Sequence, residues 1–137
     1  MTKKRRCMVC SILLFAMFVA LSVPALAATT QQVISLPADQ SWVCAGSDTR
    51  STSYSYTHAR NHSVYPTSGV DLFSTIQCRI TSPVGTTISS PSSLKEKAVD
   101  YTKVYIWDGY LHYSTVFFNF RGNTDFAANA IVSYDGL

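Results

Sequence analysis

The sequence has few acidic residues and almost no glutamate, and this scarcity limits the chemistry that the chain can perform. Its 137 residues contain eight Asp plus Glu, and Glu96 is the only glutamate. Glycoside hydrolysis needs two positioned carboxylates, whereas the aspartates are scattered and mostly occupy turn-like positions. A G-x-S-x-G nucleophile elbow is also missing. We therefore expect a protein that is not an enzyme, with a small hydrolase as the least favoured alternative.

Long hydrophobic runs are missing except at the N-terminus, where one indicates export. A positive segment at residues 3–6 precedes an apolar run at residues 7–23, and Ala25-Leu26-Ala27 supplies a small-x-small cleavage pattern. This order is that of a secretory signal peptide, and the short Lys-Lys-Arg-Arg start is typical of bacteria. We predict a signal peptide at 1–27 and a single secreted domain at 28–137, without a stable membrane span after cleavage.

Basic residues are scarce once the predicted signal is removed. Four of the eleven Lys and Arg lie at residues 3–6, which leaves seven against eight Asp and Glu in the expected mature chain. A nucleic-acid-binding domain normally carries a basic patch or stripe, and none is visible. We expect no nucleic-acid partner, and no motif points to a cofactor.

Cysteine is equally scarce. Cys7 and Cys10 lie within the predicted signal, so only Cys44 and Cys78 remain in the expected mature chain. In an exported protein, two cysteines most simply form one disulfide. We predict a Cys44–Cys78 disulfide, with two buried free thiols as the alternative.

Long helical patterns are missing after the signal, while short runs of β-branched and aromatic residues alternate with turn residues. This pattern predicts an all-β chain folded as a small antiparallel β-sandwich of two packed sheets. One short helix is predicted at Ser93–Ala98, where Ser93 and Glu96 have capping-box spacing. The expected strands are 32–36, 41–45, 52–58, 70–81, 84–89, 99–107, 110–120 and 126–134.

Asp108-Gly109 lies between two β-rich runs and predicts a type I′ hairpin over residues 103–116. Tyr105, Trp107, Tyr110 and His112 would then share one face of the hairpin. That face is either ordinary cross-strand packing or a ligand platform, because Tyr and Trp rings present an apolar body with a polar tip. The expected core-facing residues are Val104, Ile106, Leu111 and Tyr113.

Residues 53–66 gather tyrosines and histidines, with Tyr54, Tyr56, His58 and His62 as candidate ligand-binding residues. On a helix, histidines four residues apart could hold zinc. The context instead predicts a strand that ends near His58 and a polar turn at 59–61. In a strand, positions i and i+4 lie roughly 13 Å apart, so we expect no metal site. We interpret the segment as a presented aromatic and histidine surface.

The same segment resembles a known family. Trp42, Tyr54-Ser55-Tyr56, His58 and His62-Ser63 follow a W…S-x-Y-x-H…H-S layout similar to that of secreted bacteriocins of the lactococcin 972 type. The resemblance spans residues 42–63, and the cysteine pair and the aromatic-rich C-terminal half depart from it. It implies a small exported β-sandwich that binds the cell-wall precursor lipid II. Trp42, Tyr56, His58 and His62 would be structural or target-contacting positions.

Together these features predict a secreted, non-enzymatic binding protein that is bacteriocin-like and antimicrobial, or directed at a cell-envelope component. The expected partner is a cell-wall precursor or a glycan. The alternative is a secreted structural or adhesion-type domain that contacts another surface protein. The full set of candidate ligand-binding residues is Tyr54, Tyr56, His58, His62, Tyr105, Trp107, Tyr110 and His112.

Overall fold

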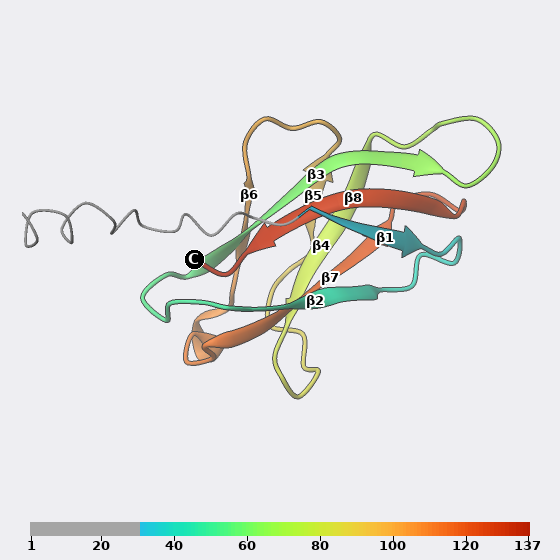
Figure 1. Cartoon of the computed structure of the whole chain (residues 1–137). Coiled ribbons are helices and arrows are strands. Elements are labelled where there is room, and N and C mark those ends of the chain that lie inside the picture. The colour runs from blue at the N-terminus through green and yellow to red at the C-terminus, as the bar shows by residue number, and fades with distance from the viewer. Residues whose placement is uncertain (1–30) are drawn as a thin grey trace, which may run out of the picture.

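The chain folds into two packed antiparallel sheets of four strands each, as seen in a computed structural model that describes residues 31–137 (Figure 1). The first sheet has the strand order β1-β8-β3-β6, and the second has the order β2-β7-β4-β5. The predicted β-sandwich is confirmed, whereas the predicted signal peptide lies outside the described residues. Within residues 31–137, no helix is long and apolar enough to span a membrane. The strands are β1 Gln32–Leu36, β2 Val43–Thr49, β3 Tyr56–Pro66, β4 Thr75–Thr81, β5 Ser92–Lys95, β6 Thr102–Tyr105, β7 Thr115–Gly122 and β8 Ala128–Asp135.

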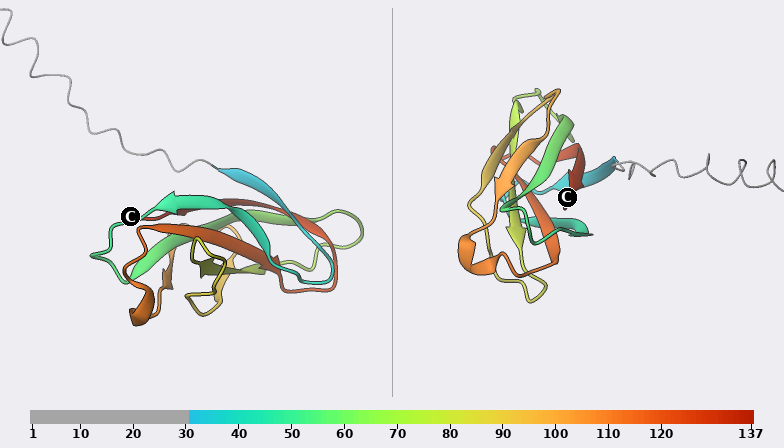
Figure 2. Two further views of the ribbon diagram at one scale, coloured as in Figure 1. Left: turned by 90° about the horizontal axis from the view of Figure 1, so that it is seen from below. Right: turned by 90° about the vertical axis from the view of Figure 1, so that its left-hand side faces the viewer.

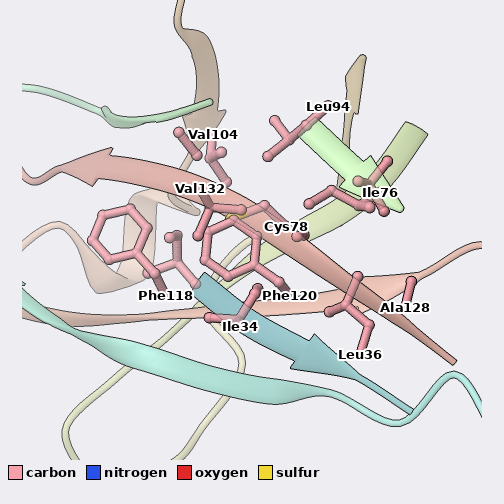
Figure 3. Close-up of a cluster of buried hydrophobic side chains, with 14 of the residues drawn as sticks. Ile34, Leu36, Ile76, Cys78, Leu94, Val104, Phe118, Phe120, Ala128 and Val132 are labelled. Atoms are coloured by element: carbon pink, nitrogen blue, oxygen red, sulfur yellow. The ribbon is translucent and has the colours of Figure 1, made fainter. Parts of the chain in front are cut away.

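The two sheets enclose one hydrophobic core, which arises from the alternation of side chains along each strand. Phe118 and Phe120 of β7 are fully buried. Figure 3 shows both rings pointing into the space that Ile34 and Val132 of the first sheet also occupy. Each fully buried side chain of this size contributes about 1.5–3 kcal/mol relative to an exposed one. Burial of these alternate positions holds the sheets together.

A polar network closes the edge where β1 of the first sheet meets β2 of the second. The Tyr134 hydroxyl donates to Gln32 Oε1 at 3.2 Å, and Gln32 Nε2 donates to the carbonyl of Ala45 at 2.8 Å. The Tyr134 ring also stacks on Phe118, with centroids 4.4 Å apart. Gly46 lacks the Cβ that would overlap the Tyr134 hydroxyl. Hydrogen bonds and packing therefore both join the sheets at this edge.

Arg50 ties two connections together at one end of the sandwich. Its guanidinium donates to the carbonyls of Leu111 and Tyr113, each at 3.0 Å, and to the carbonyl of Tyr54. The β2–β3 and β6–β7 connections lie at the same end as the C-terminus in Figure 1 and in the left view of Figure 2. Arg50 is buried, and this burial lowers its pKa. These hydrogen bonds fix the position of Tyr54, two residues before β3.

Several predicted local elements are wrong. β3 runs unbroken through the predicted turn at 59–61, and a bulge between Asn61 and Ser63 replaces that turn. Residues 84–89 form only isolated bridges. The first half of the predicted helix at Ser93–Ala98 lies in β5, which pairs with β4. Burial of Leu94 in the core outweighs the capping-box spacing of that segment.

The predicted hairpin around Asp108-Gly109 is wrong as well. β6 belongs to the first sheet and β7 to the second, so the segment between them crosses from one sheet to the other. Residues Asp108–Tyr110 form a single 3₁₀ turn, η1. Neither Asp108 nor Gly109 has the positive φ that a type I′ turn requires. Val104 and Ile106 are buried as predicted, because alternation along β6 does not depend on which strand pairs with it.

The predicted Cys44–Cys78 disulfide is also wrong, since both cysteines are free. Cys44 pairs with Asn119 and Cys78 with Phe120, on opposite sides of β7. Two strand spacings separate them by roughly 10 Å, beyond the Cα separation of about 7 Å that a disulfide tolerates. Consecutive positions on β7 face opposite sides of the sheet, so Cys44 is exposed while Cys78 lies in the core.

Candidate functional site

Tyrosine and histidine side chains line the outer face of the first sheet because of the alternation along β3. Thr57 and Ala59 are buried, so Tyr56 and His58 point outward. Tyr56 lies opposite Tyr105 of β6 in the strand register. The pairing of β3 with β6 therefore joins two aromatic segments that are far apart in the sequence.

Five aromatic side chains on this face form one continuous group. Centroid distances are 5.8 Å for Tyr54–Tyr56, 5.8 Å for Tyr56–Tyr105, 5.5 Å for Tyr56–His58 and 5.8 Å for His58–Tyr101. Tyr54 and Tyr105 are 47% and 59% exposed, and the other three are half-buried. We name this group, made of Tyr54, Tyr56, His58, Tyr101 and Tyr105, the tyrosine face.

Charged side chains border the tyrosine face. The Lys103 ammonium lies 4.2 Å from the centroid of the Tyr56 ring, a cation–π contact. In the strand register, Lys103 and Asp135 flank His58 on opposite sides. The face thus combines flat apolar rings with hydroxyl, imidazole and charged groups, a mixture suited to ligands with both apolar and hydrogen-bonding surfaces.

His62 lies on the same outer face and supports one side of it. Its Nε2 lies 2.8 Å from the hydroxyl of Ser133, and that hydroxyl donates to Tyr101 Oη at 3.1 Å. Desolvation, followed by the charge of Arg60, lowers the pKa of His62. The chain His62–Ser133–Tyr101 fixes the orientation of Tyr101.

The remaining predicted aromatic residues form a second, separate group at the β6–β7 connection. Trp107 lies 6.2 Å from Tyr110, Tyr110 lies 6.4 Å from Tyr113, and His112 lies 4.3 Å from Tyr113, measured between ring centroids. Trp107 is 45% exposed, while Tyr110 packs partly against the core. The four residues predicted to share one face of the hairpin therefore lie in two groups, because Tyr105 belongs to the tyrosine face.

Trp42, which the family resemblance grouped with the tyrosines, lies elsewhere. It immediately precedes β2 and contacts arginines of the second sheet. No group of three or more His, Cys, Asp or Glu that could hold a metal ion is present among residues 31–137. His58 and His62 share the outer face of β3, but the His58 ring packs against tyrosines whereas His62 is hydrogen-bonded to Ser133.

Tyr101 and Ser133 belong to the site but were not among the predicted residues. Tyr101 could have been found from periodicity, because Tyr101, Lys103 and Tyr105 alternate along one predicted strand and must share a face. Ser133 gave no such signal, since it lies between apolar neighbours in β8. Its role depends on the pairing of β8 with β3.

Comparisons with protein-family models, with curated proteins and with solved structures find no match to this chain. The resemblance to the lactococcin 972 type therefore rests on residues 42–63 alone. Of its four positions, Tyr56, His58 and His62 lie in β3 of one sheet, and Trp42 immediately precedes β2 of the other.

Proposed function

We propose that the protein is an exported, non-enzymatic binding protein whose tyrosine face engages a sugar-bearing component of the cell envelope. The continuous group of five rings is the observation that carries this proposal. Exposed Tyr rings give large contact area with few rotatable bonds, so little conformational entropy is lost when they bind. Their hydroxyls can hydrogen-bond to a sugar while the ring faces pack against its apolar C–H surface.

The resemblance over residues 42–63 points to the same class of target. Bacteriocins of the lactococcin 972 type bind lipid II, which carries sugars. Three of the four positions that the resemblance carries over lie at or beside the tyrosine face. We therefore favour a cell-wall precursor or peptidoglycan over other glycans.

The hydrogen-bonded pair of His62 and Ser133 could be taken for part of a hydrolase site, but the geometry around Ser133 disfavours catalysis. A nucleophilic serine needs a base that accepts its proton and a clear path to the substrate. Ser133 has no exposed surface, and its hydroxyl is already hydrogen-bonded to both Tyr101 and His62. The pair supports the tyrosine face instead.

A cosedimentation assay with purified peptidoglycan tests the proposal. The exported protein should sediment with the wall in a saturable manner. Tyr105→Ala should weaken binding at least tenfold, which corresponds to about 1.4 kcal/mol. Tyr105 is the most exposed ring of the face, so its removal should leave the thermal unfolding temperature nearly unchanged.

Tyr65→Ala provides the matched control. Tyr65 also lies in β3 and is 44% exposed, but it is outside the tyrosine face. Its variant should bind like the wild type. Equal binding by the Tyr105→Ala and Tyr65→Ala variants, or no binding by the wild type to any wall fraction together with no growth inhibition, would reject the proposal.

A protein-interaction domain is the second candidate, and a different surface favours it. Val70, Leu72 and Phe126 are 78%, 61% and 52% exposed. They belong to the β3–β4 and β7–β8 connections, which a hydrogen bond from the amide of Thr67 to the carbonyl of Ala127 joins at 3.0 Å. Concentration-dependent dimerisation that Leu72→Ser abolishes, measured by sedimentation velocity, would support this candidate.

A further inference from the structure

The outer face of the second sheet brings two arginines to one tryptophan. Arg79 lies in β4 and Arg121 in β7, and both point outward because Cys78 and Phe120 beside them are buried. Arg79 lies opposite Asn119 in the register, so the two arginines are diagonal neighbours. Their Cζ atoms lie 4.3 and 4.5 Å from the centroid of the Trp42 ring. Because both lie against the same ring, their Cζ atoms are no more than about 9 Å apart.

Both guanidinium groups retain hydrogen-bond donors that the described residues do not use. Arg121 Nε donates to Gln77 Oε1 at 2.7 Å, which fixes the plane of its guanidinium. Arg79 Nε is buried and has no acceptor among residues 31–137. Trp42, Arg79 and Arg121 are each only half-buried, so a ligand can reach them from solvent.

No carboxylate compensates these two charges within the described part of the chain. The only ion pair among residues 31–137 joins Lys97 to Glu96. The outward-facing positions of β2, β7, β4 and β5 include the further cation Lys95 and no Asp or Glu. Desolvation and the charge of Arg121 both lower the pKa of Arg79. Two cations are thus gathered, partly desolvated and left without a counter-charge.

A purely structural role accounts for only part of this arrangement. Stacking on an arginine would hold Trp42, and with it the start of β2, against the sheet. One arginine suffices for that contact, whereas a second brings repulsion. An anion placed between the two guanidinium groups would remove the repulsion and use their free donors.

We propose that Trp42, Arg79 and Arg121 form a binding site for a phosphate or diphosphate group. Guanidinium groups present paired N–H donors that match phosphate oxygens in a bidentate manner. A phosphate monoester carries about −1.5 to −2 charges at neutral pH, which balances two arginines, whereas a single carboxylate balances only one. The site lies on the sheet opposite the tyrosine face and does not depend on the function proposed for that face.

Fluorescence of Trp42 reports directly on this site. Trp107→Phe leaves Trp42 as the only tryptophan. The exported form of this variant is titrated with pyrophosphate, inorganic phosphate or acetate at constant ionic strength. Pyrophosphate should change the emission in a saturable manner and bind at least tenfold more tightly than acetate. Arg79→Gln and Arg121→Gln should each weaken binding at least tenfold, and Arg79→Lys less. Lys95→Gln, which removes a cation of the same face outside the site, should change binding less than twofold.

Phosphatidylcholine vesicles with and without phosphatidic acid distinguish a lipid headgroup from a soluble phosphate. Arginine-dependent binding to soluble pyrophosphate supports a soluble ligand, and arginine-dependent binding only to phosphatidic acid supports a lipid headgroup. Three results would overturn the proposal, provided that each variant keeps the wild-type unfolding temperature. They are no saturable change in any titration, an affinity for acetate equal to that for pyrophosphate, and a loss of binding in Lys95→Gln as large as that in the two arginine variants. Tyr105→Ala should leave this binding unchanged, so failure here and failure of the tyrosine face are distinguishable.

Discussion

Replacing Asn61 by valine should stabilise the protein. Asn61 is fully buried in β3, and neither polar atom of its amide has a hydrogen-bond partner among the described residues. A buried polar group without a partner costs about 1–3 kcal/mol in protein mutational data, and valine suits a buried strand position next to Val132. We expect the free energy of unfolding to rise by about 1–3 kcal/mol, with Tm rising by roughly 4–8 °C for each kcal/mol.

Asn119 supplies the matched comparison, because it is also a buried strand asparagine but its amide is bonded. Its Nδ2 donates to Thr81 Oγ1 at 3.0 Å and to the carbonyl of Phe117 at 3.3 Å. Asn119→Val should therefore lower the free energy of unfolding by about 0.5–1.5 kcal/mol. Urea unfolding followed by circular dichroism measures both values, and the m value should not change. If Asn61→Val destabilised the protein as much as Asn119→Val, the Asn61 amide would be bonded in solution and the reasoning would be refuted.

Three further results test other parts of the structure. Gly46→Ala should lower the free energy of unfolding by about 1–3 kcal/mol, because the added Cβ would overlap the Tyr134 hydroxyl. Tyr134→Phe in that background should recover part of the loss. If the double variant instead lost the sum of the two single losses, the overlap would not be the cause. A thiol reagent should modify Cys44 in the native protein and spare Cys78, because Cys78 is buried and burial raises the pKa of its thiol. If the chain, unfolded without a reducing agent, had no reactive thiol, the two cysteines would not be free and the structure would be contradicted at this point. Burial lowers the pKa of His62 below its ordinary 6.5. As the pH drops below 6.5, the unfolded chain therefore takes up the proton before the folded chain does, and the stability should fall. His62→Gln should reduce this dependence of Tm on pH in thermal melts, and an unchanged dependence would exclude His62 as its cause.

Local periodicity was enough to predict the fold class and the burial of Val104 and Ile106, whereas Leu111 and Tyr113, which were also predicted to face the core, are only partly buried. Periodicity could not predict which strands pair. Val104 and Ile106 are buried as expected because alternation is a property of one strand. The hairpin prediction failed because the Asp108-Gly109 signal is only a local turn preference, and β6 finds its partner in β3 instead of β7. The disulfide prediction failed for a similar reason, since β7 lies between the strands of the two cysteines and the register places them on opposite faces of the sheet.

The candidate site, too, could be predicted where it depends on local sequence but not where it depends on strand pairing. Tyr54, Tyr56 and His58 could be predicted together because they lie in one short run of sequence. Tyr105 was predicted as well, but beside Trp107, and only the pairing of β3 with β6 places it next to Tyr56. Long-range pairing, which no local pattern specifies, therefore assembles the tyrosine face.

A two-dimensional amide NMR titration with a soluble peptidoglycan fragment tests the binding role of the tyrosine face most directly. The ¹⁵N-labelled protein should show saturable shifts concentrated in residues 54–60 and 101–105, which carry the five rings. Tyr105→Ala should abolish these shifts at the same ligand concentration. Shifts concentrated instead in the β3–β4 connection or around Trp107, with residues 54–60 and 101–105 unperturbed, would contradict the account.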